Sequence, residues 1–179
     1  TTKLKSSYGT GFRYPSLYEI FYQDSGAHSY TLQAENSESF DFGIEKSFLD
    51  LNLSLDVSYF NIKYHDTLEA WKTSGWLAKN LPGTVKSQGL ELGSKWKKNE
   101  TINFGLNYTY TSTYDGAEQD DPDKNESYHD ARLVRVPRHI INLATKIKIP
   151  GNKNLNLTVN TKWSDTARDY GNGNRTFRD

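Results

Sequence analysis

The residue types that could carry out hydrolysis or bind a catalytic metal occur in this chain, but not at the spacings that such chemistry needs. Serine is abundant, yet no Gly-x-Ser-x-Gly sequence is present to hold a nucleophile on a sharp strand-to-helix turn. No cysteine is present, which excludes a disulfide framework and a thiolate metal site. We therefore predict that the protein is not an enzyme and uses no cofactor. The histidines, which lack the His-x-x-x-His spacing of a helical zinc site, are His28, His65, His129 and His139.

The acidic stretch 120–126 offers a weak calcium site. Asp121, Asp123 and Asn125 have the spacing that begins an EF-hand loop, which binds Ca²⁺ through oxygen ligands. The glycine and the glutamate that such a loop needs at its sixth and twelfth positions are replaced by Glu126 and Arg132. A solvated loop is the favoured interpretation, and no metal site is predicted.

Composition excludes two further classes of protein. The 22 Lys and Arg residues balance 22 Asp and Glu residues, whereas a nucleic-acid-binding protein normally carries a basic excess. No apolar run approaches the roughly 18 residues of a membrane-spanning helix. The chain has 12 Tyr residues in a polar background, and Tyr suits a place that is apolar on one side and wet on the other. A Tyr-rich soluble β protein and a membrane β-barrel both fit this composition.

Seven segments alternate between apolar and polar residues with a period of two, which is typical of a strand with one apolar face. Most run for about ten residues, close to the nine to eleven that a tilted strand needs to cross a bilayer. In the third segment the phase changes, so that Phe60, Ile62 and Tyr64 become the apolar positions, and a β-bulge is one explanation. The main apolar positions of the seven segments are Leu4, Tyr8 and Phe12; Phe40, Phe42 and Ile44; Leu51, Leu53, Leu55, Val57 and Tyr59; Leu90, Leu92 and Trp96; Ile102, Phe104, Leu106, Tyr108 and Tyr110; Ile141, Leu143, Ile147 and Ile149; and Leu155, Leu157, Val159 and Trp163.

The connections between these segments alternate strictly between short and long. An outer-membrane barrel has this asymmetry, because its periplasmic turns are short and its extracellular loops are long. We therefore predict an all-β fold, namely a segment of an antiparallel up-and-down transmembrane β-barrel in the bacterial outer membrane. The short turns are predicted at 48–50, 97–100 and 150–153, and the long polar connections at 14–35, 65–84, 115–132 and from 164 onward.

The two ends of the chain suggest that this barrel is incomplete. Seven strands are an odd number, whereas bacterial single-chain barrels have an even number. No secretory signal precedes the first strand, although an envelope protein needs one. We expect residues 1–179 to form a single partial β-barrel domain, with the remaining strands elsewhere in a longer protein.

Residues 8–19 resemble the Tyr-Gly-x-x-Phe-Arg-Ala-Pro-x-Leu-x-Glu box of TonB-dependent outer-membrane receptors, with Tyr14 in place of the usual Ala. A second box matches from Leu32 onward, although Tyr30 and Ala34 replace its two prolines. Further matches follow in order across nearly the whole chain, so the series is specific although each box alone is weak. The matching positions that we single out are Phe12, Arg13, Pro15, Leu17 and Glu19; Leu32, Glu35, Gly43 and Glu45; and Asn80, Gly89, Glu91 and Pro137.

This resemblance implies an active transport receptor that imports a scarce nutrient, either cobalamin, a ferric siderophore or haem, with energy from TonB and its inner-membrane complex. The boxes look most like those of the cobalamin-receptor branch. The family also implies a 22-stranded barrel, a plug domain that is absent from this chain, and contact with the lipid bilayer and lipopolysaccharide. Two alternatives stay open, a passive outer-membrane porin and a soluble β-sandwich binding module with shorter strands.

The resemblance also implies that ligand is captured by residues of the outward-facing loops. His28 lies between the first two boxes, where haem receptors of the family can hold a histidine that ligates iron. Anchoring at the membrane interface is an equally good interpretation of the loop aromatics. Cations that bridge lipopolysaccharide are a further interpretation of Asp121 and Asp123. The candidate ligand-binding residues are Tyr18, Tyr22, His28, Tyr30, Trp71 and Trp76.

Overall fold

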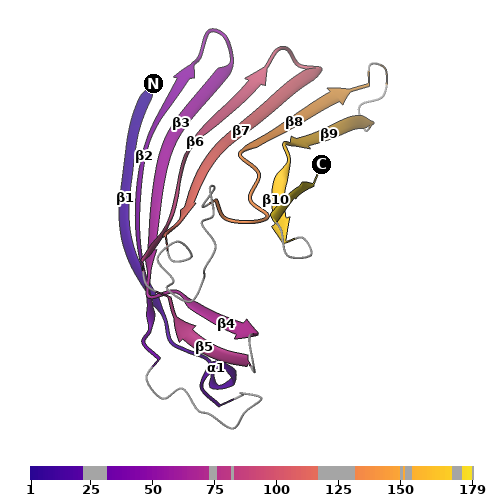
Figure 1. The fold of residues 1–179 in the computed structure, drawn as a ribbon. Helices are drawn as coiled ribbons and strands as arrows, with labels where there is room; N and C mark the ends of the chain where they lie inside the picture. The colour runs from indigo at the N-terminus through magenta and orange to yellow at the C-terminus, as the bar shows by residue number, and fades with distance from the viewer. Residues whose placement is uncertain are drawn as a thin grey trace.

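A computed structural model describes residues 1–21, 32–72, 76–81, 83–116, 132–149, 151, 155–170 and 175–178. Its main element is a curved sheet of seven antiparallel strands, with β1 and β9 at its two edges (Figure 1). Each long strand pairs with the next long strand along the chain, which confirms the predicted up-and-down topology. The sheet is not closed. Its strands, in order, are β1 (Thr2–Arg13), β2 (Glu35–Phe48), β3 (Leu53–His65), β6 (Thr84–Lys97), β7 (Ile102–Asp115), β8 (His139–Lys148) and β9 (Asn156–Ser164).

Small elements occupy three of the connections that the sequence predicted only as long and polar. A short helix, α1 (Leu17–Phe21), follows β1. A two-stranded hairpin of β4 (Leu68–Lys72) and β5 (Trp76–Asn80) follows β3, and a second hairpin of β10 (Ala167–Tyr170) and β11 (Arg175–Arg178) follows β9. Helix α1 and the β4–β5 hairpin lie at the same end of the sheet, which we call the outer end (Figure 1).

The short turns at the other end are stabilised by contacts between near neighbours in the chain. In the β2–β3 turn, the backbone N–H of Leu51 donates to the carbonyl of Phe48 at 3.3 Å, and Asn52 adopts a left-handed φ of 47°. Asparagine tolerates this conformation better than most residues. In the β6–β7 turn, the Asn99 Oδ1 atom accepts hydrogen bonds from the N–H groups of Thr101 and Ile102 at 2.9 and 2.7 Å.

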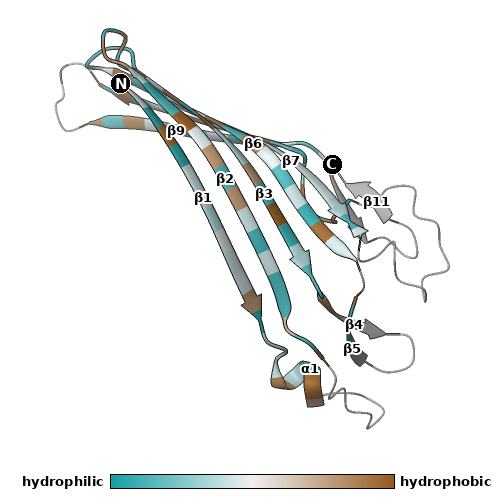
Figure 2. Cartoon of the chain, turned by 90° about the vertical axis from the view of Figure 1, so that its left-hand side faces the viewer, coloured by the Kyte–Doolittle hydropathy of each residue, from teal (hydrophilic) through white to brown (hydrophobic). Residues whose placement is uncertain are grey.

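The long strands present one apolar face and one polar face. Ile44, Val57 and Leu92 lie side by side on the apolar face, and between 42% and 45% of each residue is exposed. Among the described residues, only Ala78 and Leu81 are buried hydrophobic residues. Figure 2 shows hydrophobic and hydrophilic positions alternating along the strands. A water-soluble domain would bury so much apolar surface in a core, so this face must be covered by lipid or by another protein.

The ladder of β3 excludes a β-bulge as the explanation of the phase change in this segment. Pairing with β2 and with β6 continues without interruption along all of β3. Phe60, Ile62 and Tyr64 therefore lie on the polar face, and the apolar face of β3 ends at Tyr59. The Phe60 ring fills the space beside Gly89, where an added Cβ would come within 2.7 Å of the ring. The phase change therefore means that, near the outer end, the apolar residues of β3 lie on the polar face of the sheet instead of on the apolar face.

Within the described part of the chain, no helix is long and apolar enough to cross a membrane.

Candidate functional site

Helix α1 is fixed at the outer end by a capping box. Pro15 ends the ladder of β1 because it has no N–H to donate, and Ser16 then caps the helix. The Ser16 hydroxyl accepts a hydrogen bond from the N–H of Glu19 at 3.2 Å, and the N–H of Ser16 donates to the Glu19 carboxylate at 2.6 Å. This reciprocal pair satisfies two backbone donors that would otherwise lack partners.

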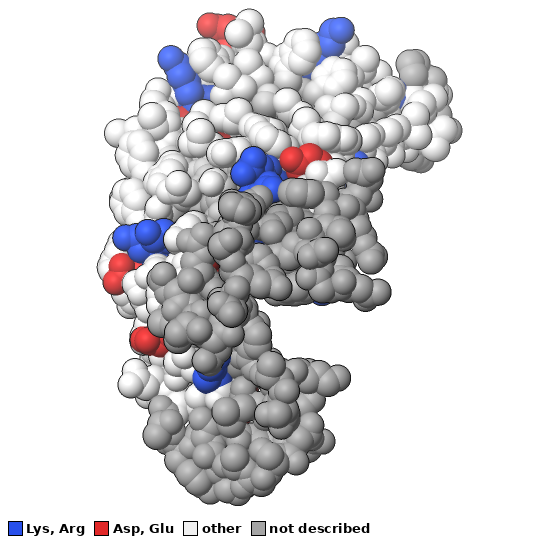
Figure 3. All heavy atoms as spheres, in the orientation of Figure 1, with Lys and Arg blue, Asp and Glu red and all other residues white. Residues whose placement is uncertain are grey.

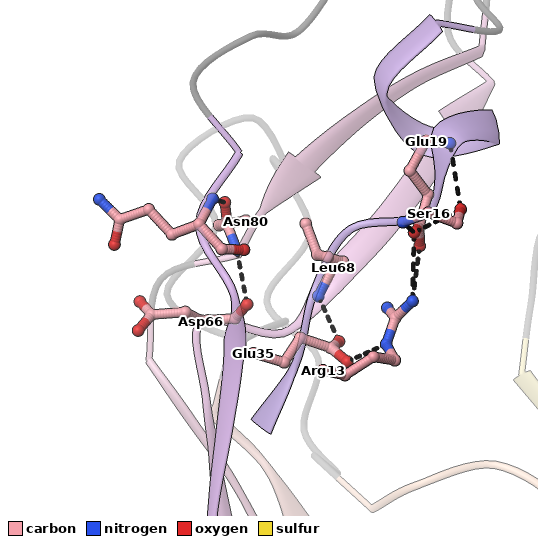
Figure 4. A network of polar contacts seen from close by, with 8 residues as sticks. Arg13, Ser16, Glu19, Glu35, Asp66, Leu68 and Asn80 are labelled. Carbon is pink, nitrogen blue, oxygen red and sulfur yellow. Dashed lines mark hydrogen bonds and ion pairs between the residues drawn. The ribbon is translucent and has the colours of Figure 1, made fainter. Parts of the chain in front are cut away.

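Arg13, at the end of β1, joins this cap to the start of β2 (Figure 4). Its guanidinium donates to the Glu19 carboxylate at 3.1 Å and also forms an ion pair with Glu35. Burial opposes ionisation of Glu19, but hydrogen bonds from Ser16 and Arg13 outweigh it and lower the pKa of this carboxyl. Because Arg13 bonds two carboxylates at once, it fixes the path of the chain between β1 and α1 relative to β2.

The same cluster extends to the β4–β5 hairpin. The second Glu35 oxygen accepts a hydrogen bond from the N–H of Leu68, the first residue of β4, at 2.6 Å. The Asn80 side chain donates to the carbonyls of Gln33 and Asp66 at 3.0 and 2.7 Å, and it accepts from the N–H of Gln33 at 2.8 Å. Figure 4 shows these groups converging on one region. We call the set the outer-end network, and its members are Arg13, Ser16, Gln33, Glu19, Glu35, Asp66, Leu68 and Asn80.

Four of the positions that carry the family resemblance thus meet in one network, namely Arg13, Glu19, Glu35 and Asn80. They are separated by up to 67 positions in the chain, and their pattern did not predict that they belong to one group of hydrogen bonds. The part of Ser16 could have been found from the Ser-x-x-Glu spacing of a capping box. The roles of Asp66 and Leu68 could not have been found from the sequence, because these two residues contribute only backbone groups to the network.

The other matched positions lie apart from this network. Phe12 is on the apolar face of β1, and its ring meets that of Tyr14 edge-to-face with centroids 5.2 Å apart. Gly43 and Gly89 are buried on the polar face, which also carries Glu45 and Glu91. The other matched positions are exposed or half-buried, namely Pro15, Leu17, Leu32 and Pro137.

Most of the predicted ligand-binding residues lie partly or wholly outside the described residues. Tyr18 lies in α1 at the outer end and is 54% exposed. Trp71 and Trp76 belong to β4 and β5, but their side chains fall outside the described part. The positions that lie wholly outside the described residues are Tyr22, His28, Tyr30, Asp121 and Asp123. In the ranges that the structure covers, no group of three or more His, Asp or Glu side chains could hold a metal ion.

The polar face of the sheet carries charges of both signs. On β1 and β2, the Lys5 ammonium lies 2.7 Å from the Glu45 carboxylate, and Lys3 lies 3.8 Å from it. Ser7 donates a hydrogen bond to Asp41 at 3.0 Å, next to a hollow of about 230 Å³ beside Gly43. In the view of Figure 3, several small groups contain both positive and negative side chains, and uncharged areas separate these groups from one another.

These features fit a barrel wall with lipid on one side and a polar lumen on the other, and comparison with known proteins identifies the family. The model of the family described as TonB dependent receptor-like, beta-barrel matches residues 1–179. The chain belongs to the β-barrel family of TonB-dependent receptors. This is a bacterial outer-membrane family, so the outer end of the barrel segment corresponds to the long-loop side. Among curated proteins, no sequence matches this chain.

Solved structures of receptors show the same fold. The ferric enterobactin receptor PfeA from Pseudomonas aeruginosa is similar with a TM-score of 0.72 and 19% identity, covering 93% of this chain and 26% of that one. The FrpB iron transporter from Neisseria meningitidis gives a TM-score of 0.68 and 17% identity, covering 93% and 25%. The pyoverdine receptor FpvA from P. aeruginosa gives 0.64 and 17%, covering 99% and 25%. The chain therefore spans about a quarter of the length of these receptors.

Proposed function

We propose that this barrel segment belongs to an outer-membrane receptor that imports a scarce nutrient, and that the nutrient is an iron complex such as a ferric siderophore. The role is binding and transport rather than catalysis. Receptors for ferric enterobactin and pyoverdine and an iron transporter are among the similar structures, which supports iron over cobalamin. Haem is a second iron source that fits the same proposal.

The outer-end network is the observation that carries this proposal. A passive wall needs only strands and short connections, whereas this chain ties α1 and the β4–β5 hairpin rigidly to the ends of three long strands. Binding residues are commonly found on loops that a rigid scaffold positions, because fixing the loop beforehand lowers the entropy cost of binding. The network thus supplies a fixed outer surface on which a nutrient can be captured.

The barrel segment has no energy source of its own. Uptake against a concentration gradient would therefore depend on TonB and the inner-membrane complex, acting through parts of the receptor beyond residues 1–179. A passive porin of the same architecture would need neither partner.

The experiment is an uptake assay with the full-length receptor. Cells that lack their own receptors are supplied with a labelled ferric siderophore, haem or cobalamin, with TonB present or deleted. We expect receptor-dependent accumulation of an iron complex that disappears without TonB. Accumulation that persists without TonB would favour a porin, and accumulation of cobalamin alone would contradict the iron proposal.

A further inference from the structure

On the short-turn side, the apolar face of the sheet ends in a row of large side chains from four adjacent strands. The register of the ladders places each of these side chains opposite the next, from β2 through β3 and β6 to β7. On β2, β3 and β6, no strand residue follows on this face before the chain enters a short turn. We call this set the short-turn row, and its members are Phe48, Leu53, Trp96 and Phe104.

Two lysines hold their ammonium groups over the rings of this row. The Nζ atom of Lys46 lies 5.0 Å from the centre of the Phe48 ring, and the Nζ atom of Lys98 lies 6.0 Å from the centre of the Trp96 ring. An aromatic ring attracts an ammonium group over its face. Phe48 and Trp96 are two strand spacings apart, which is about 10 Å. The row therefore carries two separate cation–ring pairs at the edge of the apolar face.

Lys46 belongs to the apolar face itself, where it stands opposite Leu55. A lysine in such a place lays its methylene stem along apolar surface and extends its ammonium group to the water boundary. The Lys46 ammonium extends toward Phe48, and thus toward the short turn rather than toward the centre of the sheet. Its position marks the level at which the apolar surface gives way to polar surroundings.

No acidic side chain in the described part of the chain forms an ion pair with Lys46 or Lys98. In the β6–β7 turn, the Glu100 carboxylate is already held by Lys97 at 2.8 Å. The β2–β3 turn carries Asp50, which makes no ion pair with either lysine. A ring occupies only one side of an ammonium group, so N–H donors remain for a negatively charged acceptor. The short-turn row thus combines an apolar surface with two uncompensated positive charges.

This combination fits a phospholipid. In a barrel of this family the short turns face the periplasm, so the row lies at the headgroup level of the inner leaflet. Acyl chains can cover the apolar side chains above the row, such as Leu55 and Val57, while a phosphate accepts hydrogen bonds from the ammonium groups. A zwitterionic headgroup also brings an ammonium group of its own, which the two lysines repel. A headgroup with net negative charge brings no such group, and basic side chains near a membrane surface attract it.

We propose that the short-turn row, together with Lys46 and Lys98, forms a binding site for an anionic phospholipid of the periplasmic leaflet, of the phosphatidylglycerol type. This lipid-facing site is separate from the proposed nutrient uptake. The occupant is a lipid rather than a soluble acidic protein, because Lys46 lies within a face that only acyl chains cover. The two cation–ring pairs hold the ammonium groups in place before the lipid arrives, which lowers the entropy cost of binding.

Photo-cross-linking of the full-length receptor tests this proposal at the site itself. A photoreactive benzoylphenylalanine in place of Leu53 lies between the two cation–ring pairs. The receptor is placed in lipid nanodiscs that contain about three parts phosphatidylethanolamine to one part phosphatidylglycerol, and mass spectrometry identifies the cross-linked lipids. We expect the ratio of anionic to zwitterionic lipid among the products to exceed the ratio in the disc at least about fivefold. Equal ratios would overturn the proposal.

A pair of charge-matched variants shows whether the lysines cause this selection. Lys46→Gln with Lys98→Gln should bring the ratio among the products down to that of the disc. Lys63→Gln with Lys86→Gln removes the same charge from the outer end of the same face, where the Lys86 Nζ atom also lies over a ring, 5.9 Å from the centre of Tyr114. This control should leave the ratio at Leu53 unchanged. An equal ratio in both double variants would contradict the proposal.

The salt dependence of the receptor with unaltered lysines gives a test that needs no change of charge. The screening length of salt falls to about 3 Å at 1 M, so attraction between an ammonium group and a phosphate at the membrane surface weakens. The enrichment of phosphatidylglycerol should therefore fall toward the ratio of the disc at about 1 M salt. Enrichment that persists there would assign the selection to the apolar row and overturn the role of the lysines. None of these results depends on TonB-driven uptake, so this proposal and the proposed function can fail separately.

Discussion

At the short-turn end of the sheet, the β2–β3 and β6–β7 turns are held by hydrogen bonds between residues two or three positions apart, whereas the outer-end network joins residues up to 47 positions apart. The short turns need only a polar residue that suits a tight turn, such as Asn52 or Asn99. Apart from the local bonds of Glu19 with Ser16 and Arg13, the outer-end network forms only when several segments of the chain arrive together. The difference indicates that the short turns only connect adjacent strands, while the outer-end network positions α1 and the β4–β5 hairpin.

Among the changes that would test the difference between the two ends, removing the Asn80 side chain is expected to have the largest effect on local stability. Asn80→Ala deletes three hydrogen bonds at once, so we expect local opening of the β4–β5 hairpin to become easier by about 2–3 kcal/mol. Native-state hydrogen exchange of the full-length receptor measures this at the hairpin amides. Exchange in the β6–β7 turn serves as the internal control and should stay unchanged. Unaltered protection of the hairpin would show that other contacts hold it.

Arg13→Ala should have a smaller effect on the same end. The Arg13 side chain is 48% exposed, so solvent screening limits the expected loss to about 1 kcal/mol at α1 and the start of β2. Arg13→Lys should recover little of it, because a single ammonium cannot reproduce the planar fork that bonds two carboxylates. Hydrogen exchange at α1 distinguishes the variants. Full recovery with lysine would mean that charge alone matters there.

Asn99→Ala tests the short-turn end in the same way. Two backbone donors lose their acceptor, but both are accessible to water, so we expect a loss of about 0.5–1 kcal/mol confined to this turn. The amides of Thr101 and Ile102 should exchange faster, while the outer-end network should be unaffected. Spread of the effect to α1 would contradict the independence of the two ends.

Acidification should loosen the outer end with the smallest effect of the four. The pKa of Glu19 is lowered in the folded state, so its stabilising contribution is complete above its unfolded value of about 4.5 and is lost as the pH falls through the lower folded value. A fluorophore on Tyr18→Cys should report increasing mobility of α1 in that acidic range. Glu19→Gln should remove the pH dependence. A transition that persists in this variant would assign the effect to another group.

Local patterns in the sequence predicted the seven long strands well but did not predict the contacts at the outer end, for physical reasons. Alternation of side chains follows directly from strand geometry, so all seven long strands were predicted, and the antiparallel order followed from the loop lengths. A β-bulge was one explanation of the phase change in β3, and it is not formed, because the apolar residues move to the polar face instead, as Phe60 does. The β4–β5 hairpin was missed inside a polar stretch. The contacts of Arg13, Glu35 and Asn80 depend on chain segments meeting in space, which spacing alone does not encode.

The apolar face of an outer-membrane barrel wall contacts lipid, and this has a consequence for how the family diverges. A protein core resists even a one-carbon change because its side chains interlock, but fluid lipid tails adapt to any side-chain outline. Exchanges among Leu, Ile, Val and Phe at positions such as Ile44, Val57 and Leu92 should therefore be nearly neutral. Sequence can drift over this half of the wall while the backbone stays in place. Relatives that share 19% identity with this chain can then keep a TM-score of 0.72.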